Sequence, residues 1–264
     1  MTFTAGPLGA VHDLTAQGWA VATGHMGAGH LNTYTVVLRP DGTTFSPGMV
    51  GVALDRRGQV YGHRYTADGA EAVRHDGTAA TVLPAPEGRS AAVRDVTRGG
   101  TACGSAFTQV PVPAPRPAVE WVDHVPILWQ PDGTRVDLPM IGEESWCTHI
   151  AGTSAAGVFE RADGTQHAVL WTGGAAVEVG PAGVETVVTG VNAAGVVVGH
   201  TVTPGGDRAG FVATATTWRP LTARGAAYAV PSDVNDNGTV VGTAYDAAGK
   251  PRATRWAAPA PSQP

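Results

Sequence analysis

The chain has few charged and few aromatic residues for its length. Only 15% of its 264 residues are charged and 6% are aromatic, whereas an average soluble domain is about 25% charged. A disordered chain would be richer in charge and poorer in apolar residues than the 43% present here. No stretch approaches the roughly 20 apolar residues of a membrane span, and the first residues lack the basic and apolar segments of a signal peptide. We therefore expect a folded, cytoplasmic protein with no membrane partner.

Clustered basic residues, cysteine frameworks and nucleotide-binding motifs are also missing. The 17 Lys and Arg residues are scattered and are outnumbered by 22 Asp and Glu residues, which disfavours nucleic acid because duplex binding needs a cationic face. The two cysteines, Cys103 and Cys147, cannot form a disulfide framework or a four-thiolate zinc site. Both lie among apolar residues and are expected to be buried, inert thiols. We expect no cofactor and a monomer whose partner is a small molecule.

Glycine and proline are abundant, and both are spread along the chain. The 36 Gly and 20 Pro residues exclude coiled coils and helical bundles. Much of the glycine belongs to a repeat in which an apolar residue and a turn precede a β-branched run that ends in Gly. The clearest copies end at Gly199 and Gly242. The predicted closing glycines are Gly24, Gly62, Gly104, Gly157, Gly199 and Gly242.

The spacing of these glycines predicts a propeller. Successive spacings of 38 to 53 residues resemble the roughly 40 to 45 residues of a four-stranded blade. A third strand is expected to end in a bulky residue, and an Asp-Gly turn and a short fourth strand are expected to follow it in several repeats. The predicted third-strand residues are Leu38, Val73, Trp129, Trp171, Trp218 and Trp256.

The predicted fold is all-β, a single six-bladed β-propeller domain over residues 1–264. Residues 1–10 are expected to supply the closing strand of the last blade, so that the N-terminal strand closes the ring without an open edge. Residues 258–264 are expected to form a flexible tail. The blades are predicted at about 11–48, 49–87, 88–140, 141–183, 184–225 and 226–257.

The repeats resemble the HAF family of bacterial repeat proteins. That family's pattern is an apolar residue and Asn, a turn, Val-Val-Gly, and then Ala-Phe-x-Trp. Residues 190–199 with 209–211, and residues 233–242 with Trp256, match it best. The resemblance implies a propeller and transfers no catalytic motif.

Two repeat positions carry polar side chains that a propeller would bring together. The position before the buried apolar residue of the first strand holds Asp13, Ala53, Asp95, His149, Gly190 and Asp233. An Asp before a turn commonly caps backbone amides, and this remains the alternative interpretation. The position after the closing Gly includes His25, His63 and His200. These three could bind a divalent metal, exchange protons or simply pack between blades.

A third feature is an insertion in the third blade. It runs from Phe107 through the proline-rich residues 111–117 to Trp121. As a loop over one mouth of the funnel, it would face Glu143, Glu144, Trp146 and His149; a plain surface loop is the alternative.

These features favour an enzyme that binds a small, largely apolar molecule at the funnel. The expected chemistry is non-redox cyclisation, isomerisation or elimination, for example in natural-product biosynthesis. The expected catalytic residues are His149, Glu143, Glu144 and Asp95. The expected substrate contacts are Trp121, Trp146, Phe107, Asp13, Asp233 and Arg94. The alternatives are a non-catalytic binding module and a metal-dependent lyase that uses His25, His63 and His200.

Overall fold

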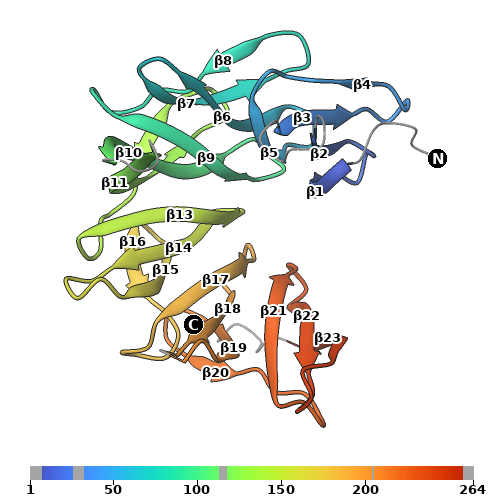
Figure 1. Ribbon diagram of the computed structural model, residues 1–264, viewed down its shortest axis with the longest axis vertical. Helices are drawn as coiled ribbons and strands as arrows, with labels where there is room; N and C mark the ends of the chain where they lie inside the picture. The colour runs from blue at the N-terminus through green and yellow to red at the C-terminus, as the bar shows by residue number, and fades with distance from the viewer. Residues whose placement is uncertain (1–7, 26–32, 113–117, 204, 258–264) are drawn as a thin grey trace. The chain divides into compact units, whose positions relative to one another are not determined.

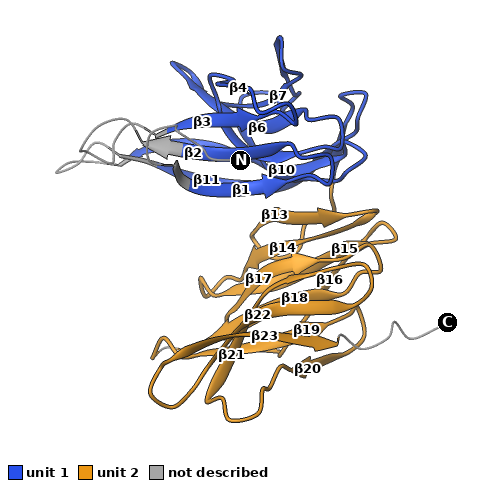
Figure 2. Ribbon diagram, turned by 90° about the vertical axis from the view of Figure 1, so that its right-hand side faces the viewer, with its two compact units in different colours: residues 1–137 blue, residues 138–264 orange. Residues whose placement is uncertain are grey.

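The computed structural model describes residues 8–25, 33–112, 118–203 and 205–257, and these residues form only strands, turns and connections (Figure 1). The strands make six antiparallel sheets in which consecutive strands are neighbours. Two compact units divide them, residues 1–137 and residues 138–264 (Figure 2). The all-β prediction is therefore confirmed. Among the described residues there is no apolar helix of membrane-spanning length.

The first unit contains three four-stranded sheets. The first sheet consists of β1 (Leu8–Leu14), β2 (Ala20–His25), β3 (Thr33–Leu38) and β4 (Thr44–Phe45). The second sheet consists of β5 (Val50–Leu54), β6 (Val60–Thr66), β7 (Gly69–His75) and β8 (Ala80–Val82). The third sheet consists of β9 (Ser90–Val96), β10 (Ala102–Val112), β11 (Ala118–Trp129) and β12 (Arg135–Asp137).

The second unit contains the other three sheets. The fourth sheet consists of β13 (Glu144–Ala151), β14 (Ser154–Glu160), β15 (Gln166–Thr172) and β16 (Ala175–Glu178). The fifth sheet consists of β17 (Thr186–Val191), β18 (Val197–Val202), β19 (Arg208–Ala213) and β20 (Trp218–Pro220). The sixth sheet has three described strands, β21 (Tyr228–Val234), β22 (Thr239–Tyr245) and β23 (Pro251–Ala257).

Each first strand contains a β-bulge at the same place, and the bulge explains the repeat glycine. In the fourth sheet, Cys147 pairs with Gly157 and His149 pairs with Ala156, so Thr148 is the extra residue. The bulge turns a first-strand carbonyl towards the second strand. A Cβ atom at Gly157 would lie only 2.0 Å from the Trp146 carbonyl oxygen. Glycine is therefore required at this position because a side chain would not fit. Its backbone does not have a positive φ.

The same close approach occurs in four other sheets. A Cβ atom would lie between 1.9 and 2.3 Å from a first-strand carbonyl oxygen at Gly62, Gly104, Gly199 and Gly242. The first sheet differs, because Val11 pairs with Ala22 across the equivalent bulge. The prediction that Gly24 is the equivalent residue is thus wrong by two positions. Its strand has a second irregularity between Leu8 and Ala10 that shifts the register.

In the third, fourth and sixth sheets a third-strand tryptophan binds the connection that precedes the sheet. Trp129 Nε1 donates a hydrogen bond to the Pro84 carbonyl at 2.8 Å, and Trp171 Nε1 does so to Pro139 at 2.8 Å. Trp256 Nε1 donates in the same way to Thr222. The buried indole thus satisfies its own N–H and a connection carbonyl together.

Two predicted third-strand residues are wrong. Trp218 lies in the fourth strand β20, and Ala213 holds the equivalent position opposite Val197. In the second sheet the equivalent position is held by His75, which pairs with Val60, and not by Val73. Both errors arose because the loops before these residues differ in length, so a fixed count from the glycine missed the register.

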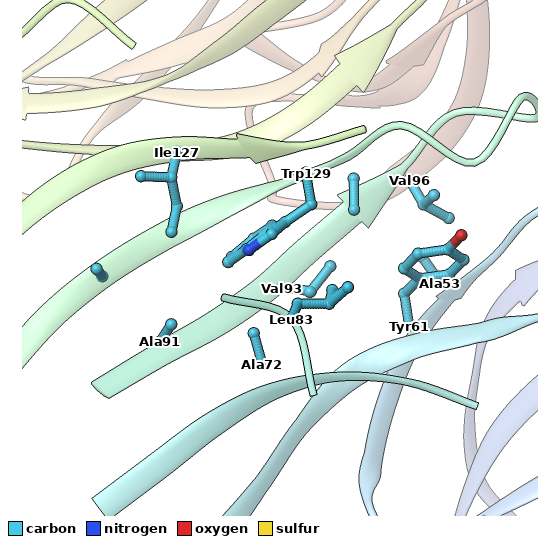
Figure 3. Close-up of a cluster of buried hydrophobic side chains, with 11 residues drawn as sticks. Ala53, Tyr61, Ala72, Leu83, Ala91, Val93, Val96, Ile127 and Trp129 are labelled. Atoms are coloured by element: carbon cyan, nitrogen blue, oxygen red, sulfur yellow. The ribbon is translucent and has the colours of Figure 1, made fainter. Parts of the chain in front are cut away.

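The largest described core cluster of the first unit lies between the second and third sheets (Figure 3). Trp129 is fully buried in this cluster near Val93 and Leu83, and Tyr61 lies at the other end of the cluster beside Ala53 and Val96 (Figure 3). Cys103 and Cys147 are both buried, as predicted.

The N-terminal assignment needs one correction. Residues 8–10 belong to β1 of the first sheet and not to a strand of the last one. Residues 1–7 and 258–264, predicted as a closing strand and a tail, lie outside the described residues.

Candidate functional site

The residue that follows each bulge, here called the post-bulge residue, occupies one register position in all six sheets. Each pairs with the second-strand residue that precedes the repeat glycine or its equivalent, Ala22. The post-bulge residues are Asp13, Ala53, Asp95, His149, Gly190 and Asp233. The six positions that the sequence grouped are therefore equivalent in structure. Asp13 and Asp95 lie in the first unit, and His149 and Asp233 lie in the second.

The three aspartates hold backbone groups. The carboxylates of Asp13, Asp95 and Asp233 each accept a hydrogen bond from the next residue's N–H at 2.7 Å. Asp13 also accepts a hydrogen bond from the Leu54 N–H of the second sheet at 2.8 Å. The capping alternative is thus correct for these contacts, and Asp13 additionally links two sheets.

His149 lies in the fourth sheet and Asp233 in the sixth sheet of one unit; His149 is half-buried and Asp233 is exposed. β17 packs between β13 and β21, and its post-bulge residue is Gly190, which has no side chain. A Cβ atom at Gly190 would lie 2.9 Å from Asp233 Oδ1, so the Asp233 carboxyl occupies that space. Burial lowers the pKa of His149 to about 4 and raises the pKa of Asp233. His149 Nδ1 lies 2.8 Å from Thr148 Oγ1, in hydrogen-bond contact.

The predicted partners of His149 divide between the units. Glu144 and Trp146 lie on β13, the same strand as His149, and both are half-buried. Glu143 is exposed in the turn before that strand, and its N–H donates to the Glu160 carbonyl at 2.9 Å. Asp95 lies in the other unit.

The first unit brings together four residues that the sequence assigned to different roles. Trp121 stacks on Phe107 with ring centroids 4.2 Å apart. The His63 ring stands edge-on to Trp121 at 6.1 Å, and the Arg94 guanidinium lies 5.7 Å from the Trp121 ring. Tyr65, which was not predicted, also contacts both rings and is 63% exposed. Tyr65 lies two residues after His63 in the same strand, so the two side chains share a face of the sheet, and the sequence alone could have grouped them.

The insertion that contains Trp121 is a β-ribbon, which corrects the predicted loop. β10 and β11 stay paired as far as Val112 opposite Ala118, while residues 113–117 lie outside the described part. A bulge opposite Phe107 bends the ribbon, and Asp123 there has a φ of 56°. His124, also missed from sequence, bridges Ser105 Oγ and the Trp121 carbonyl at 3.2 Å each. The ribbon thereby holds the Trp121 ring on the second and third sheets.

The histidine set does not form a metal site in the described residues. With the corrected register, Thr23 replaces His25 as the equivalent of His63 and His200. His63 lies in the first unit and His200 in the second. Both are buried, with a ring Nδ1 that has no hydrogen-bond partner. No group of three potential metal ligands occurs in the part of the chain that the structure describes.

Burial of His63 predicts destabilisation by acid. Burial lowers its pKa to about 4, whereas an unfolded histidine titrates near 6.5. Between these values the unfolded chain binds more protons, so the free energy of unfolding should fall as the pH falls from about 6.5 to 4. His63→Asn should reduce this slope in urea titrations at several pH values, leaving the contributions of His149, His167 and His200, whose pKa values burial also lowers. Replacement of the exposed His12 by Gln is the control, and an unchanged slope in His63→Asn would contradict the assignment.

Comparisons with known proteins found distant structural similarity only. No family model and no curated protein matches the chain. The β-propeller domain of the Trilobed protease from Pyrococcus furiosus, which has an open velcro topology, is 9% identical with a TM-score of 0.41, over 97% of this chain and 99% of that one. A variant of the AtxE2 isopeptidase is 11% identical with a TM-score of 0.32, over 98% of this chain and 51% of that one. A gluconolactonase candidate is 16% identical with a TM-score of 0.38, over 86% of this chain and 83% of that one. All three scores lie below 0.5, so the description of the fold rests on the six sheets themselves.

Proposed function

We propose that the six sheets are the blades of one propeller and that its first strands surround a binding funnel. Repetition of one strand order and one bulge across all six sheets supports this proposal. Closure by the N-terminal strand, membership of the HAF-type repeat family, a monomeric state and a cytoplasmic location belong to the same proposal. An experimental structure with an unpaired edge on both the first and the sixth sheets would contradict closure.

We propose further that the chain is an enzyme for non-redox cyclisation, isomerisation or elimination of a small, largely apolar molecule. The observation that carries this proposal is the pair His149 and Asp233. They hold the same register position in the fourth and sixth sheets, with only Gly190 at that position in the fifth. Because Gly190 has no side chain, the Asp233 carboxyl reaches into the space that a Cβ atom at Gly190 would take, on the side of the fifth sheet that continues towards His149.

The directions of the two pKa shifts assign the roles. Partial burial raises the pKa of Asp233, although the residue is exposed at its outer side, so we assign to its carboxyl group the role of proton donor. The lowered pKa of His149 keeps its imidazole neutral at pH 7. Such an imidazole is a weak base, but a proton on the carbon next to a carbocation is acidic enough for a weak base. Asp233 would protonate a double bond of the ligand, and His149 would remove a proton from the carbon next to the resulting cation to form a new double bond. The composition of the ligand is then unchanged. His149 releases its proton to solvent and Asp233 takes one up, which restores both groups.

Loss of either group should abolish conversion without unfolding the chain. We expect His149→Gln and Asp233→Asn each to lower the rate about 100-fold or more. The assay incubates the purified protein with a small-molecule extract of cells that lack it and follows all compounds by mass spectrometry. Products with unchanged mass and a new retention time indicate isomerisation or cyclisation, and loss of water indicates elimination. His12→Gln should retain full activity, and equal conversion by all variants would overturn the assignment.

A non-catalytic binding module is the second candidate function. The contacts of Trp121 with Phe107, His63 and Arg94 beside the exposed Tyr65 favour it, because aromatic rings and a cation are typical of recognition surfaces. Under this alternative the mass spectrometry would recover a bound compound unchanged.

A further inference from the structure

The second unit contains a cavity of about 770 Å³ that none of the roles assigned above uses. It lies between the fifth and sixth sheets and is called here the fifth–sixth groove. β19 contributes Arg208 and Gly210, and the sixth sheet contributes Tyr228 and Tyr245. Its volume falls within the range of about 300 to 1,000 Å³ for small-molecule sites.

The groove has an aromatic floor, and His200, which does not itself line the groove, lies on the strand next to it. Tyr228 and Tyr245 pair across β21 and β22, and their rings stack at 4.6 Å with an interplanar angle of 11°. His200 pairs with Gly210, so its side chain lies on the same sheet face as the groove residue Gly210. His200 is only 7% exposed, and its Nδ1 has no hydrogen-bond partner. Buried polar atoms normally have a hydrogen-bond partner, so we expect a ligand or a water molecule at this nitrogen.

The first unit shows what an equivalent groove holds. Between the second and third sheets, His63 occupies the register position of His200, and Phe107 that of Tyr245. The Trp121 indole fills that space, stacked on Phe107 at 4.2 Å and edge-on to His63 at 6.1 Å. The chain therefore places its own planar ring against this pair of positions.

The two grooves carry their charged side chain at different positions. The first unit has Arg94 beside the Trp121 ring, where the sixth sheet has Ser232. In the fifth sheet Arg208 pairs with Val202. In the second sheet the equivalent pair is Ala70 with Tyr65, so Arg208 corresponds to Ala70. Ala70 packs in the cluster that contacts Trp121, whereas Arg208 is exposed and lines the cavity beside Asp207. An arginine in place of alanine adds a cation that can bind a carboxylate.

We propose that the fifth–sixth groove binds a planar aromatic carboxylate. Its ring lies against the tyrosine pair as Trp121 lies on Phe107, with the edge of the ring towards His200 and the carboxylate on Arg208. This site is separate from the proposed centre at His149 and Asp233.

Indole and indole-3-carboxylate are the probes, because the indole ring reproduces the Trp121 side chain. Ligand-observed NMR titration of the full chain should show both binding, with the carboxylate tighter. Tyr245→Leu should weaken both about tenfold by removing the stacking surface. Arg208→Gln should weaken only indole-3-carboxylate, about fivefold, and it is an exposed substitution that leaves the fold intact.

Tyr34→Leu, in the first unit, is the matched control and should change neither affinity. A smaller cavity of about 400 Å³ at the equivalent position between the first and second sheets is lined by Tyr34. Binding lost in Tyr34→Leu but kept in Tyr245→Leu would overturn the proposal. Equal weakening of both probes by Arg208→Gln, or no binding of either probe at millimolar concentration, would also overturn it.

Discussion

Gly157→Ala should lower the free energy of unfolding by about 3 kcal/mol or more. The added methyl group would lie 2.0 Å from the Trp146 carbonyl oxygen and 3.0 Å from the Cys147 Cα atom. Both belong to the bulged backbone of β13, so no side-chain rotation can relieve the clash. The strands must separate locally, and the paired backbone around Gly157 must shift with them. Urea denaturation followed by circular dichroism measures the loss.

Gly99→Ala is the matched control for this substitution. Gly99 does not require a positive φ, and the nearest atom to an added Cβ is Thr97 Oγ1 at 3.7 Å, an ordinary contact. Its effect should stay within about 0.5 kcal/mol. Equal destabilisation by the two substitutions would mean that backbone freedom, and not the bulge, explains the repeat glycines.

Trp129→Ala should cost about 3 to 5 kcal/mol of unfolding free energy. Its indole is fully buried in the cluster shared by the second and third sheets. Its Nε1 also donates to the Pro84 carbonyl in the connection between those sheets. The substitution therefore opens a cavity and leaves a carbonyl without its donor, which thermal or urea unfolding will detect.

Two further variants divide this loss into its parts. Trp129→Phe keeps most of the buried ring and removes the donor, so it should cost less than the alanine change. Trp218→Ala, at a residue that is 47% exposed, should stay within about 0.5 kcal/mol. A result in which Trp218→Ala destabilises as much as Trp129→Ala would contradict the strand assignment.

Local patterns in the sequence predicted the strands well because each repeat folds on its own neighbours. The β-branched runs before Gly199 and Gly242, and the Asp-Gly turns, depend only on nearby residues. Counting from the glycine failed at Trp218 and Val73, where loop length varies. It also failed at Gly24, where a second irregularity in β1 shifts the register. Such shifts are set by pairing across strands, which a single-strand pattern does not contain.

For the candidate site, the sequence predicted which residues are equivalent between repeats, but it did not predict which side chains contact one another. The equivalence of Asp13, His149 and Asp233 followed from the repeat and is present in the register. The grouping of Trp121 with His63 and Arg94 did not follow, because it depends on a bulge at Asp123 that bends the long ribbon. Asp is one of the few residues other than glycine that adopt a positive φ, but a single Asp in a strand does not predict one.

The bulge and its facing glycine also disfavour slipped registers as the chain folds. Six similar hairpins in one polypeptide invite a strand to pair with the wrong copy or to slip along its partner. In five sheets only the glycine can lie opposite the bulged backbone, so a one-residue slip would put a side chain against a carbonyl. Wrong registers are thus penalised within each hairpin, before neighbouring sheets need to dock.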